Sequence, residues 1–298
     1  MSRTSSTKQS ADTVNNRYGQ FLPFDIPVHQ ASMTDRLSSS RDTTSREWFE
    51  DWFSHPLYLK VYQHRDTAEA ALCVDTILKI TGFDQTLFES VDSAVLDIAC
   101  GAGRHALEFA RRGLMVSAND LSKFLLGTAE NDACKADLSI EFSGFDMRHI
   151  CLDRQFDLIV QLFSSFGYFE TDEEDRVVIR NVSNMLRDDG WYVLDLINPE
   201  YLRKHFIPNT AKTVESLSIK EERSLSDRKV SKKITISDPE GETVSFTESV
   251  RLYSKSDISA LLESEGMEII RSAGDYHGSD FDQASSPRML LFIRKRLA

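Results

Sequence analysis

The chain has 298 residues, and 41% of them are hydrophobic, which is enough for the core of one large domain or two small ones. It carries 47 acidic and 35 basic residues, a formal net charge of −12. This charge argues against a nucleic-acid partner, because a phosphate backbone attracts a cationic surface. The sequence has no run of about 18 apolar residues and no apolar signal segment near its start. We therefore expect a cytoplasmic protein without a membrane partner.

The four cysteines are scattered along the chain without the Cys-x-x-Cys spacing that is typical of zinc sites. Their number and spacing do not indicate a disulfide framework either. We expect most of them to be small buried side chains, and we expect no metal site. The four positions are Cys73, Cys100, Cys134 and Cys151.

The start of the chain divides into two segments of different composition. Residues 1–44 are rich in Ser, Thr, Asn and Gln, which favours a mostly disordered tail over a transit peptide. Residues 45–82 concentrate aromatic side chains and predict a helical cap in front of a larger domain. Within the cap, the apolar spacing predicts a helix that begins after Asp66, ends by Gly82 and buries one face.

Residues 83–298 alternate short apolar runs with helical patterns, which is typical of an α/β fold with a parallel sheet covered on both faces. A capping box at Thr171 opens one of the helices, and Gly190 is expected to end it. The last two strands resemble a hairpin at the sheet edge. The expected strands are 94–99, 114–119, 139–144, 156–163, 191–198, 267–271 and 288–295, and the expected helices are 104–113, 122–136, 171–187 and 256–266.

Residues 200–253 interrupt this alternation. Two β-like segments, 229–237 and 242–253, flank an Asp-Pro-Glu-Gly turn at 238–241. We therefore expect an antiparallel β insertion at about 200–253, after the fifth strand of the main sheet.

The stretch VLDIACGAGRHALEFA joins an expected strand to an expected helix through a glycine-rich turn. Gly101, Gly103 and Ala106 match the spacing of a dinucleotide site, and Asp120 lies at a suitable distance for a ribose carboxylate. Asp97, however, stands four residues before Gly101, where a carboxylate would repel a pyrophosphate and favour a ligand with a cationic end. The turn therefore favours S-adenosylmethionine over a nicotinamide dinucleotide.

The chain resembles the class I S-adenosylmethionine-dependent methyltransferases over about residues 91–298. The resemblance implies a Rossmann-like, seven-stranded, mostly parallel sheet with helices on both faces and an antiparallel last strand. It also implies S-adenosyl-L-methionine as the cofactor, a helical cap before the sheet and a β insertion after strand five. The motifs that carry it, in the family's order, are VLDIACGAGRH, SANDLS, GFDMRH, FDLIVQLFSSFGYFE and NMLRDDGWYVLDLIN.

The resemblance also implies roles in the donor site. Asp120 would bind the ribose hydroxyls, and Asp146 with the backbone of Met147 would bind the adenine. Residues 161–164 would border the sulfonium.

Two residues of the cap complete the expected donor site. Tyr62 and Arg65 are candidates to hold the donor's carboxylate, since a guanidinium suits that partner. The full expected set is Tyr62, Arg65, Asp97, Ala99, Gly101, Gly103, Asp120, Leu121, Asp146, Met147 and Gln161.

The acceptor is expected to be a small molecule. The loop LFSSFGYF after the fourth strand lacks the Asn/Asp-Pro-Pro-aromatic turn of nucleic-acid amino methyltransferases, and the chain lacks the Pro-Cys pair of cytosine C5 enzymes. The later segments resemble bacterial small-molecule N- and O-methyltransferases. In that group a β insertion shapes the acceptor pocket or a subunit interface, so a homo-oligomer through the insertion is a further expectation.

Two residues are candidates for a general base. Tyr168 lies in the loop after the fourth strand, and His277 lies just before the last strand and would titrate in the useful range. His205 and Tyr276 have less support. A dedicated base is not obligatory, because the methyl donor is already activated and positioning supplies much of the catalysis.

Alternative interpretations stay open at this point. Taken singly, Asp97 could satisfy a buried turn, Asp120 could cap a helix and Asp146 could be a solvated loop acid. Arg65 could pair with a surface acid, within a cap that only packs on the core. The chain could also be an NAD(P)-dependent oxidoreductase on a Rossmann-like fold, or a protein that binds S-adenosylmethionine without catalysis.

Overall fold

The computed structural model describes residues 47–63, 67–83 and 93–296, so Arg65 and the expected tail at 1–44 lie outside the described residues. The helices are α1 (Trp48–Phe53), α2 (Leu57–Val61), α3 (Thr67–Thr81), α4 (Arg104–Arg111), α5 (Lys123–Lys135), α6 (Asp172–Met185), α7 (Pro199–Lys204) and α8 (Lys255–Ser264). The strands are β1 (Ala94–Ile98), β2 (Met115–Asn119), β3 (Ile140–Ser143), β4 (Phe156–Gln161), β5 (Leu186–Ile197), β6 (Asn209–Val214), β7 (Leu217–Leu225), β8 (Lys229–Ser237), β9 (Thr243–Arg251), β10 (Met267–Ala273) and β11 (Arg288–Lys295).

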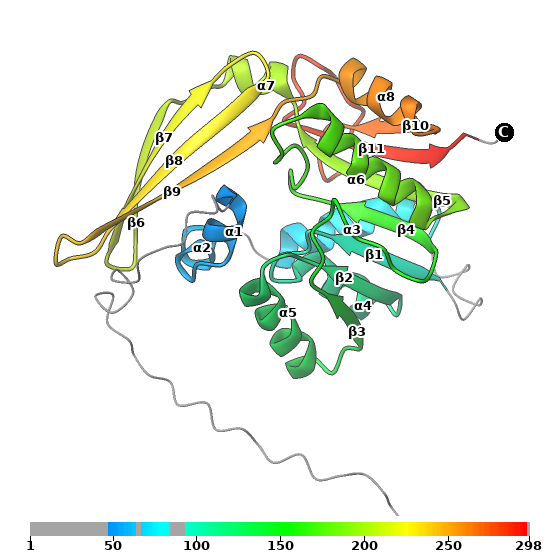
Figure 1. The fold of residues 1–298 in the computed structure, drawn as a ribbon, viewed down its shortest axis with the longest axis horizontal. Coiled ribbons are helices and arrows are strands. Elements are labelled where there is room, and N and C mark those ends of the chain that lie inside the picture. Colours follow the sequence, from blue (N-terminus) through cyan, green and yellow to red (C-terminus); the bar gives the residue numbers. More distant parts are fainter. Residues whose placement is uncertain (1–46, 64–66, 84–92, 297–298) are drawn as a thin grey trace, which may run out of the picture. The chain divides into compact units, whose positions relative to one another are not determined.

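The larger sheet has seven strands in the order β10-β11-β5-β4-β1-β2-β3 (Figure 1). The strands from β5 to β3 in this order all pair in parallel. Strand β11 runs antiparallel to both of its neighbours, β5 and β10. The predicted Rossmann-like sheet with an antiparallel last strand is therefore confirmed. Because the central strands are parallel, their carboxyl ends meet at one edge of the sheet.

Each face of this sheet carries its own core. Helices α3 and α4 cover one face, where Ile77 packs in the same apolar cluster as Val95 of β1. Helices α6 and α8 cover the other face, where Val178 packs in the same cluster as Ile159 of β4. Every residue of β1 is buried, as expected of a central parallel strand covered on both faces, and Asp97 is its one charged residue. Within the described segments, none of the helices has the length and apolar character needed to span a membrane.

A second, antiparallel sheet follows β5 and α7, with the strand order β6-β7-β8-β9. It has four strands where we expected two, because β6 and β7 are mostly polar and contain no continuous apolar run. The apolar side of this sheet faces the N-terminal helices. Ile219, Ile234 and Ile236 are buried in one cluster with Trp52 of α1 and Val61 of α2. The insertion and the first two helices therefore share a core of their own.

Helix α6 begins at the predicted capping box but ends earlier than expected. It ends at Met185, because Leu186 already has an extended backbone and begins β5. Gly190 therefore lies inside β5 and does not end the helix. A Cβ atom there would come within 3.1 Å of the Asp157 carbonyl oxygen, so the glycine permits close packing of β5 against β4.

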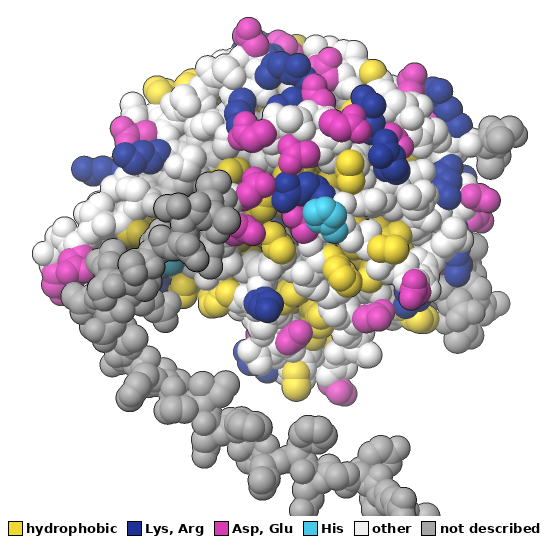
Figure 2. Space-filling model, in the orientation of Figure 1, with side chains coloured by type: hydrophobic (Ala, Val, Ile, Leu, Met, Phe, Trp, Pro, Cys, Tyr) yellow, Lys and Arg dark blue, Asp and Glu magenta, His cyan; other side chains and the backbone are white. Residues whose placement is uncertain are grey.

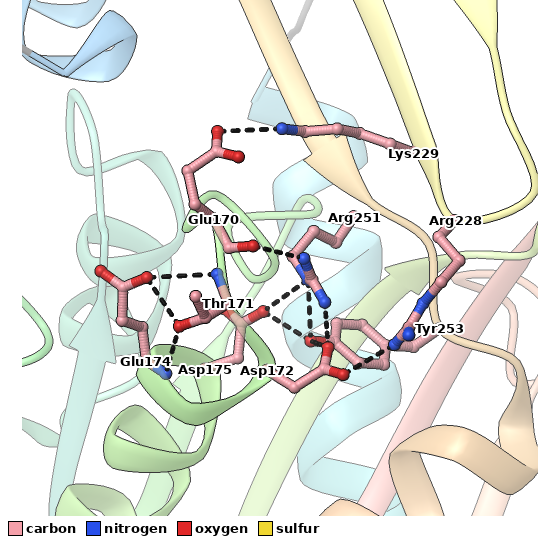
Figure 3. A network of polar contacts seen from close by, with 9 residues as sticks. All are labelled: Glu170, Thr171, Asp172, Glu174, Asp175, Arg228, Lys229, Arg251 and Tyr253. Atoms are coloured by element: carbon pink, nitrogen blue, oxygen red, sulfur yellow. Dashed lines mark hydrogen bonds and ion pairs between the residues drawn. The ribbon is translucent and has the colours of Figure 1, made fainter.

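A polar network ties the second sheet to the N-terminus of α6 (Figure 3). Arg228 donates to Asp172 at 2.7 Å, and Arg251 pairs with the same carboxylate. The Tyr253 hydroxyl donates to Asp175 Oδ2 at 2.5 Å, whereas Asp175 Oδ1 is buried and has no hydrogen-bond partner within the described part of the chain. Acidic side chains are favourable at a helix N-terminus, and here they also anchor the second sheet just before β8 and at the end of β9.

Asp175 makes the stability of this network depend on pH. Burial raises the pKa of Asp175 to about 7, although the Tyr253 hydroxyl and Arg251 favour its charged form. The folded protein therefore keeps a proton that the unfolded chain, with a pKa near 3.9, has already released. Stability must then fall as pH rises from about 4 through about 7.

We expect Asp175→Asn to remove this loss of stability. The difference in thermal unfolding midpoint between variant and wild type should shift in the variant's favour from about pH 5 to about pH 8. Asp188→Asn is the control, because it also removes one carboxylate but at a side chain that is 88% exposed. A midpoint difference that stays constant across this range would contradict the prediction.

Candidate functional site

A cavity of about 570 Å³ opens at the carboxyl ends of β1 and β2, the edge where α/β proteins bind ligands. Its size suits a cofactor or a small molecule. The loops after β3 and β4 and the helices α1 and α2 complete its wall. Figure 2 shows apolar side chains exposed in the middle of one face, over the region that α5 and β1 to β3 occupy in Figure 1. Eight of the expected donor-binding residues line the cavity: Tyr62, Asp97, Ala99, Gly101, Asp120, Leu121, Asp146 and Met147.

The glycine-rich turn after β1 depends on left-handed backbone conformations. The φ angles are 55° at Ala99, 59° at Gly101 and 78° at Gly103. Two of these three positions are glycine, which adopts such angles without steric cost. The carboxylate of Asp120, directly after β2, accepts hydrogen bonds from the backbone N–H groups of Gly101 and Ser122, both at 2.8 Å. One acid therefore ties the ends of two neighbouring strands together at the floor of the cavity.

Asp97 and Asp120 are both buried at this edge, at 1% and 7% exposed. Burial, and then the charge of Asp120, raise the pKa of Asp97 to about 8. Burial also raises the pKa of Asp120 to about 6, against the two backbone N–H groups that favour its charged form. The neighbouring hydrogen bonds do not offset the cost of burying these two carboxylates. A ligand that carries positive charge would therefore stabilise their charged forms.

Three buried side-chain atoms around the cavity have no hydrogen-bond partner among the residues that the structure describes: Asp97 Oδ2, His105 Nε2 and Ser165 Oγ. Each belongs to a residue that is at most 5% exposed. Burial, and then the charge of Arg104, lower the pKa of His105 to about 3, so its imidazole is neutral. Buried polar atoms are nearly always paired in proteins. The set therefore fits a ligand that brings both a cationic donor and an anionic acceptor.

The loop after β3 forms another part of the wall. Asn119 fixes it through two hydrogen bonds to the backbone of Phe145, at 2.8 and 2.9 Å. Phe145 and Leu121 remain 44% and 36% exposed, as apolar surface beside the cavity. Burial pushes the pKa of Asp146 up, but its hydrogen bonds with Arg148 outweigh burial and hold the pKa below its ordinary value. Asp146 is therefore charged, with its carboxylate bound to Arg148 at 2.6 Å.

Tyr62 lines the cavity, but its hydroxyl is engaged by the second sheet. It donates to Glu248 Oε1 at 2.5 Å and also contacts Lys232. Trp52 Nε1 donates to the same Glu248 oxygen at 2.7 Å. The expected contact of this hydroxyl with a donor carboxylate is thus replaced by a bond to Glu248, and the ring of Tyr62 serves as wall. Its expected companion, Arg65, lies outside the described residues.

Tyr168 lies in the cavity wall, where it contacts the aromatic side chains of α1. Its ring centroid is 5.1 Å from that of Trp48 and 5.7 Å from that of Phe53. Burial, and then the neighbouring Tyr58, raise the pKa of Tyr168 well above its ordinary value. The phenol therefore stays protonated near neutral pH, so it can donate a hydrogen bond to a ligand but is a poor general base.

The other base candidates lie away from the cavity, which corrects the expectation for His277. That side chain is exposed in the turn after β10, at a separate surface depression beside Glu69 and Arg288. The turn carries it to the start of α3 instead of the carboxyl ends of β1 and β2. His205 is exposed after α7, and its ring bonds to a backbone carbonyl of its own helix. Tyr276 lines the same depression as His277.

Two further expected donor-binding residues do not line the cavity. Gln161 is fully buried, and its amide is bonded to the Ser165 carbonyl at 3.0 Å and the Tyr192 hydroxyl at 2.8 Å. It supports the loop after β4 from outside the cavity wall. Gly103 is the left-handed N-cap of α4, where an added Cβ atom would lie 2.7 Å from the Cβ of Ala129. That glycine allows α4 and α5 to approach closely.

Sequence reasoning missed several residues of the cavity wall. The position of His105, directly after the glycine turn in the first turn of α4, was a signal that could have found it. Ser165 offered none, because distant residues set the conformation of its loop. The missed residues include Phe49, Phe53, Tyr58, His105, Phe145, Ser165 and Phe169.

Comparison with known proteins agrees with this geometry. A family model described as a methyltransferase domain matches residues 95–190. A dTDP-3-amino-3,4,6-trideoxy-α-D-glucopyranose N,N-dimethyltransferase from Streptomyces venezuelae is 33% identical over 103 residues, covering 35% of this chain and 42% of that protein. A glycine/sarcosine N-methyltransferase from Aphanothece halophytica is 29% identical over 118 residues, covering 39% and 44%. The matches thus span less than half the length of these curated relatives.

The likeness to solved structures extends over most of the fold. An S-adenosylmethionine-dependent methyltransferase from Clostridium acetobutylicum is similar over 83% of this chain and 99% of that chain, with a TM-score of 0.69 and 19% identity. The oxidoreductase alternative is set aside by these matches and by the position of Asp97 before the turn. Residues 95–190 therefore match a methyltransferase domain, and the chain shares its fold with a solved S-adenosylmethionine-dependent methyltransferase.

Proposed function

We propose that this protein transfers a methyl group from S-adenosylmethionine to a nitrogen or oxygen atom of a small-molecule acceptor. The observation that carries the proposal is the set of unpartnered atoms Asp97 Oδ2, His105 Nε2 and Ser165 Oγ around one cavity. The amino-acid end of the donor has an ammonium and a carboxylate group that match such atoms. The family match over 95–190 supports the same conclusion.

Each part of the donor has a suitable partner in the cavity. Asp97 suits the ammonium group, because its carboxylate is buried beside a second acid. Neutral His105 and Ser165 suit the carboxylate as hydrogen-bond donors. Asp120 suits the ribose hydroxyls, and Phe145 offers an exposed ring to the adenine. When bound, S-adenosylmethionine supplies a methyl group already activated by its sulfonium, so the residues of the chain bind, orient and exclude water.

An amine is the acceptor that we favour. The names of both curated relatives place their acceptor atom at nitrogen. In such a transfer the nitrogen lone pair forms the new N–C bond, the C–S bond electrons remain on sulfur, and the methylated nitrogen then loses a proton to solvent. A neutral amine needs no base for its attack, which agrees with the protonated state of Tyr168 in the wall. We assign Tyr168 the role of holding the acceptor in line.

The cap and the insertion are the remaining parts of the proposal. We propose that residues 45–82 close over the donor and that the insertion at about 200–253 shapes the acceptor side of the cavity, with Glu248 joining the two. A homo-oligomer through the insertion would use a polar surface, since exposed hydroxyl pairs such as Thr235 with Ser245 link β8 and β9. The activity, the acceptor and the cytoplasmic location of the whole protein are likewise proposals.

The function is tested by turnover with S-adenosylmethionine that carries an isotopically labelled methyl group. We expect labelled product and S-adenosylhomocysteine from at least one amine in a panel of amino sugars, amino acids, alcohols and carboxylic acids, measured by mass spectrometry. Reactions without acceptor provide the control. Binding of S-adenosylhomocysteine without turnover of any panel member would indicate a non-catalytic binding protein, and binding of NAD(P) alone would contradict the proposal.

Gly101 provides a test of the donor site with a matched control. An added Cβ atom at Gly101 would meet no protein atom within 4 Å, so a side chain there would enter the cavity. Gly113 has the same open surroundings and a positive φ of 83°, but it does not line the cavity. We expect Gly101→Val to weaken S-adenosylhomocysteine binding by about tenfold or more in calorimetry, with Gly113→Val unchanged. Equal affinities in the two folded variants would refute the assignment.

The raised pKa of Asp97 predicts that donor binding depends on pH. In the free protein this pKa is about 8, so the carboxyl group must lose a proton to pair with an ammonium group. Affinity for S-adenosylhomocysteine should therefore rise from about pH 6 to about pH 8, by at most about tenfold per pH unit. Asp97→Asn should bind more weakly and lose this dependence. Calorimetry across the range would contradict the role of Asp97 if wild-type affinity were constant.

A further inference from the structure

The loop after β4 holds a strained backbone beside the cavity. Phe163 and Ser164 have φ angles of 64° and 60°, a left-handed conformation that residues other than glycine rarely adopt, least of all in succession. Such strain persists only where the surrounding structure enforces it. Phe163 and Ser165, the residue after Ser164, both line the cavity. Whatever enforces the strain therefore also positions the cavity wall.

A single buried residue binds both strained backbone groups. Asp195 lies in β5 and is fully buried. Its side-chain Oδ2 accepts a hydrogen bond from the Phe163 N–H at 2.8 Å. Its backbone carbonyl accepts one from the Ser164 N–H at 3.1 Å. Rotation of either strained residue toward an ordinary conformation would leave a buried donor or acceptor unpaired, which is costly.

Two side chains from the end of the chain hold Asp195 in place. Arg288 of β11 donates from Nε to Oδ1 at 2.9 Å and pairs through Nη2 with Oδ2 at 2.7 Å. The Tyr276 hydroxyl donates to the same Oδ2 at 2.6 Å. Arg288 Nη2 also donates to Ser164 Oγ at 2.8 Å, so the arginine grips the loop directly. Both carboxylate oxygens of Asp195 therefore accept hydrogen bonds, which a buried ion pair needs to offset its loss of hydration.

The loop is also held one residue further on. The side-chain amide of Gln161 donates from Nε2 to the Ser165 backbone carbonyl at 3.0 Å. The Tyr192 hydroxyl donates to Oε1 of the same side chain at 2.8 Å. The backbone of Ser165 is therefore held by Gln161, while its hydroxyl is buried at the cavity and has no hydrogen-bond partner in the described segments. The attachments leave this oxygen free for a ligand.

We propose that Asp195 is a positioning residue for the donor site, holding Phe163 and Ser164 in the strained conformation that presents Ser165 to the donor. Arg288 is its partner in this role. Asp195 does not line the cavity and acts through the loop. The inference rests on the proposed function, because it takes the donor as the ligand of Ser165.

A double-mutant cycle tests the inference. Asp195→Asn removes the charge that holds Phe163 and that keeps Arg288 on Ser164, and Ser164→Gly lets position 164 keep its φ of 60° without strain and without that arginine bond. We expect Asp195→Asn to weaken S-adenosylhomocysteine binding by about tenfold in the otherwise wild-type chain and by less than about threefold beside Ser164→Gly. Asp157→Asn is the matched control, since it breaks the 2.7 Å ion pair with Arg187 at the opposite end of β4.

Hydrogen exchange of residues 162–168 without ligand gives a second measurement that does not depend on the proposed function. Exchange should be faster in Asp195→Asn than in wild type or Asp157→Asn. If wild type failed to bind S-adenosylhomocysteine, the proposed function would be contradicted. The exchange measurement would still test whether Asp195 holds the loop after β4. Should Asp195→Asn not fold, Arg288→Lys takes its place, because it keeps the charge and loses the bond to Ser164.

Three results would overturn the inference. Unchanged exchange of residues 162–168 would show that Asp195 does not hold the loop. An unfolding midpoint that falls with unchanged affinity would mean that Asp195 only stabilises the fold. Equal losses of affinity with and without Ser164→Gly would mean that backbone strain has no part in its effect.

Discussion

The burial of two carboxylates at the carboxyl ends of β1 and β2 is the constraint on which the site depends. Asp97 and Asp120 are both almost inaccessible, and the charge of one raises the pKa of the other. Such a pair costs free energy unless something compensates it. The backbone N–H groups of Gly101 in the glycine turn and of Ser122 after β2 compensate Asp120, and Asp97 keeps one oxygen without a partner among the described residues. The architecture thus holds an uncompensated acid where a cationic ligand group can pair with it.

The remaining parts of the fold place the other walls around this pair. The antiparallel strand β11 brings Arg288 beside β5, where it meets Asp195 and holds the loop after β4 in its strained conformation. The second sheet meets the first two helices through Glu248, which binds Trp52 and Tyr62. Elements that lie more than a hundred residues apart in the chain therefore fix one cavity. This is why the later part of the chain matters for a site whose motif lies in residues 95–105.

Part of the candidate site could be predicted from the sequence, and the place of each residue in the fold explains which part. Asp97, Gly101 and Asp120 stand at or just after strand ends, and the parallel arrangement alone brings such positions together. The structure places Gln161 below the loop after β4 and not in the cavity wall, because a position at the end of a strand can face either side. It places His277 away from the cavity, because the length and path of a loop decide where its tip lies, and periodicity carries no information about that path.

By itself, the sequence determined the alternation of strands and helices, the parallel sheet, and the acid-bearing glycine turn, because these follow from local periodicity and from short-range turn chemistry. It could not determine which polar atoms lack partners, since that depends on every neighbour of a buried group. Only the tertiary structure decided that Asp97, His105 and Ser165 present unpaired atoms to one cavity. Only it decided that Tyr62 turns its hydroxyl to Glu248, because the insertion that supplies this partner is almost two hundred residues away.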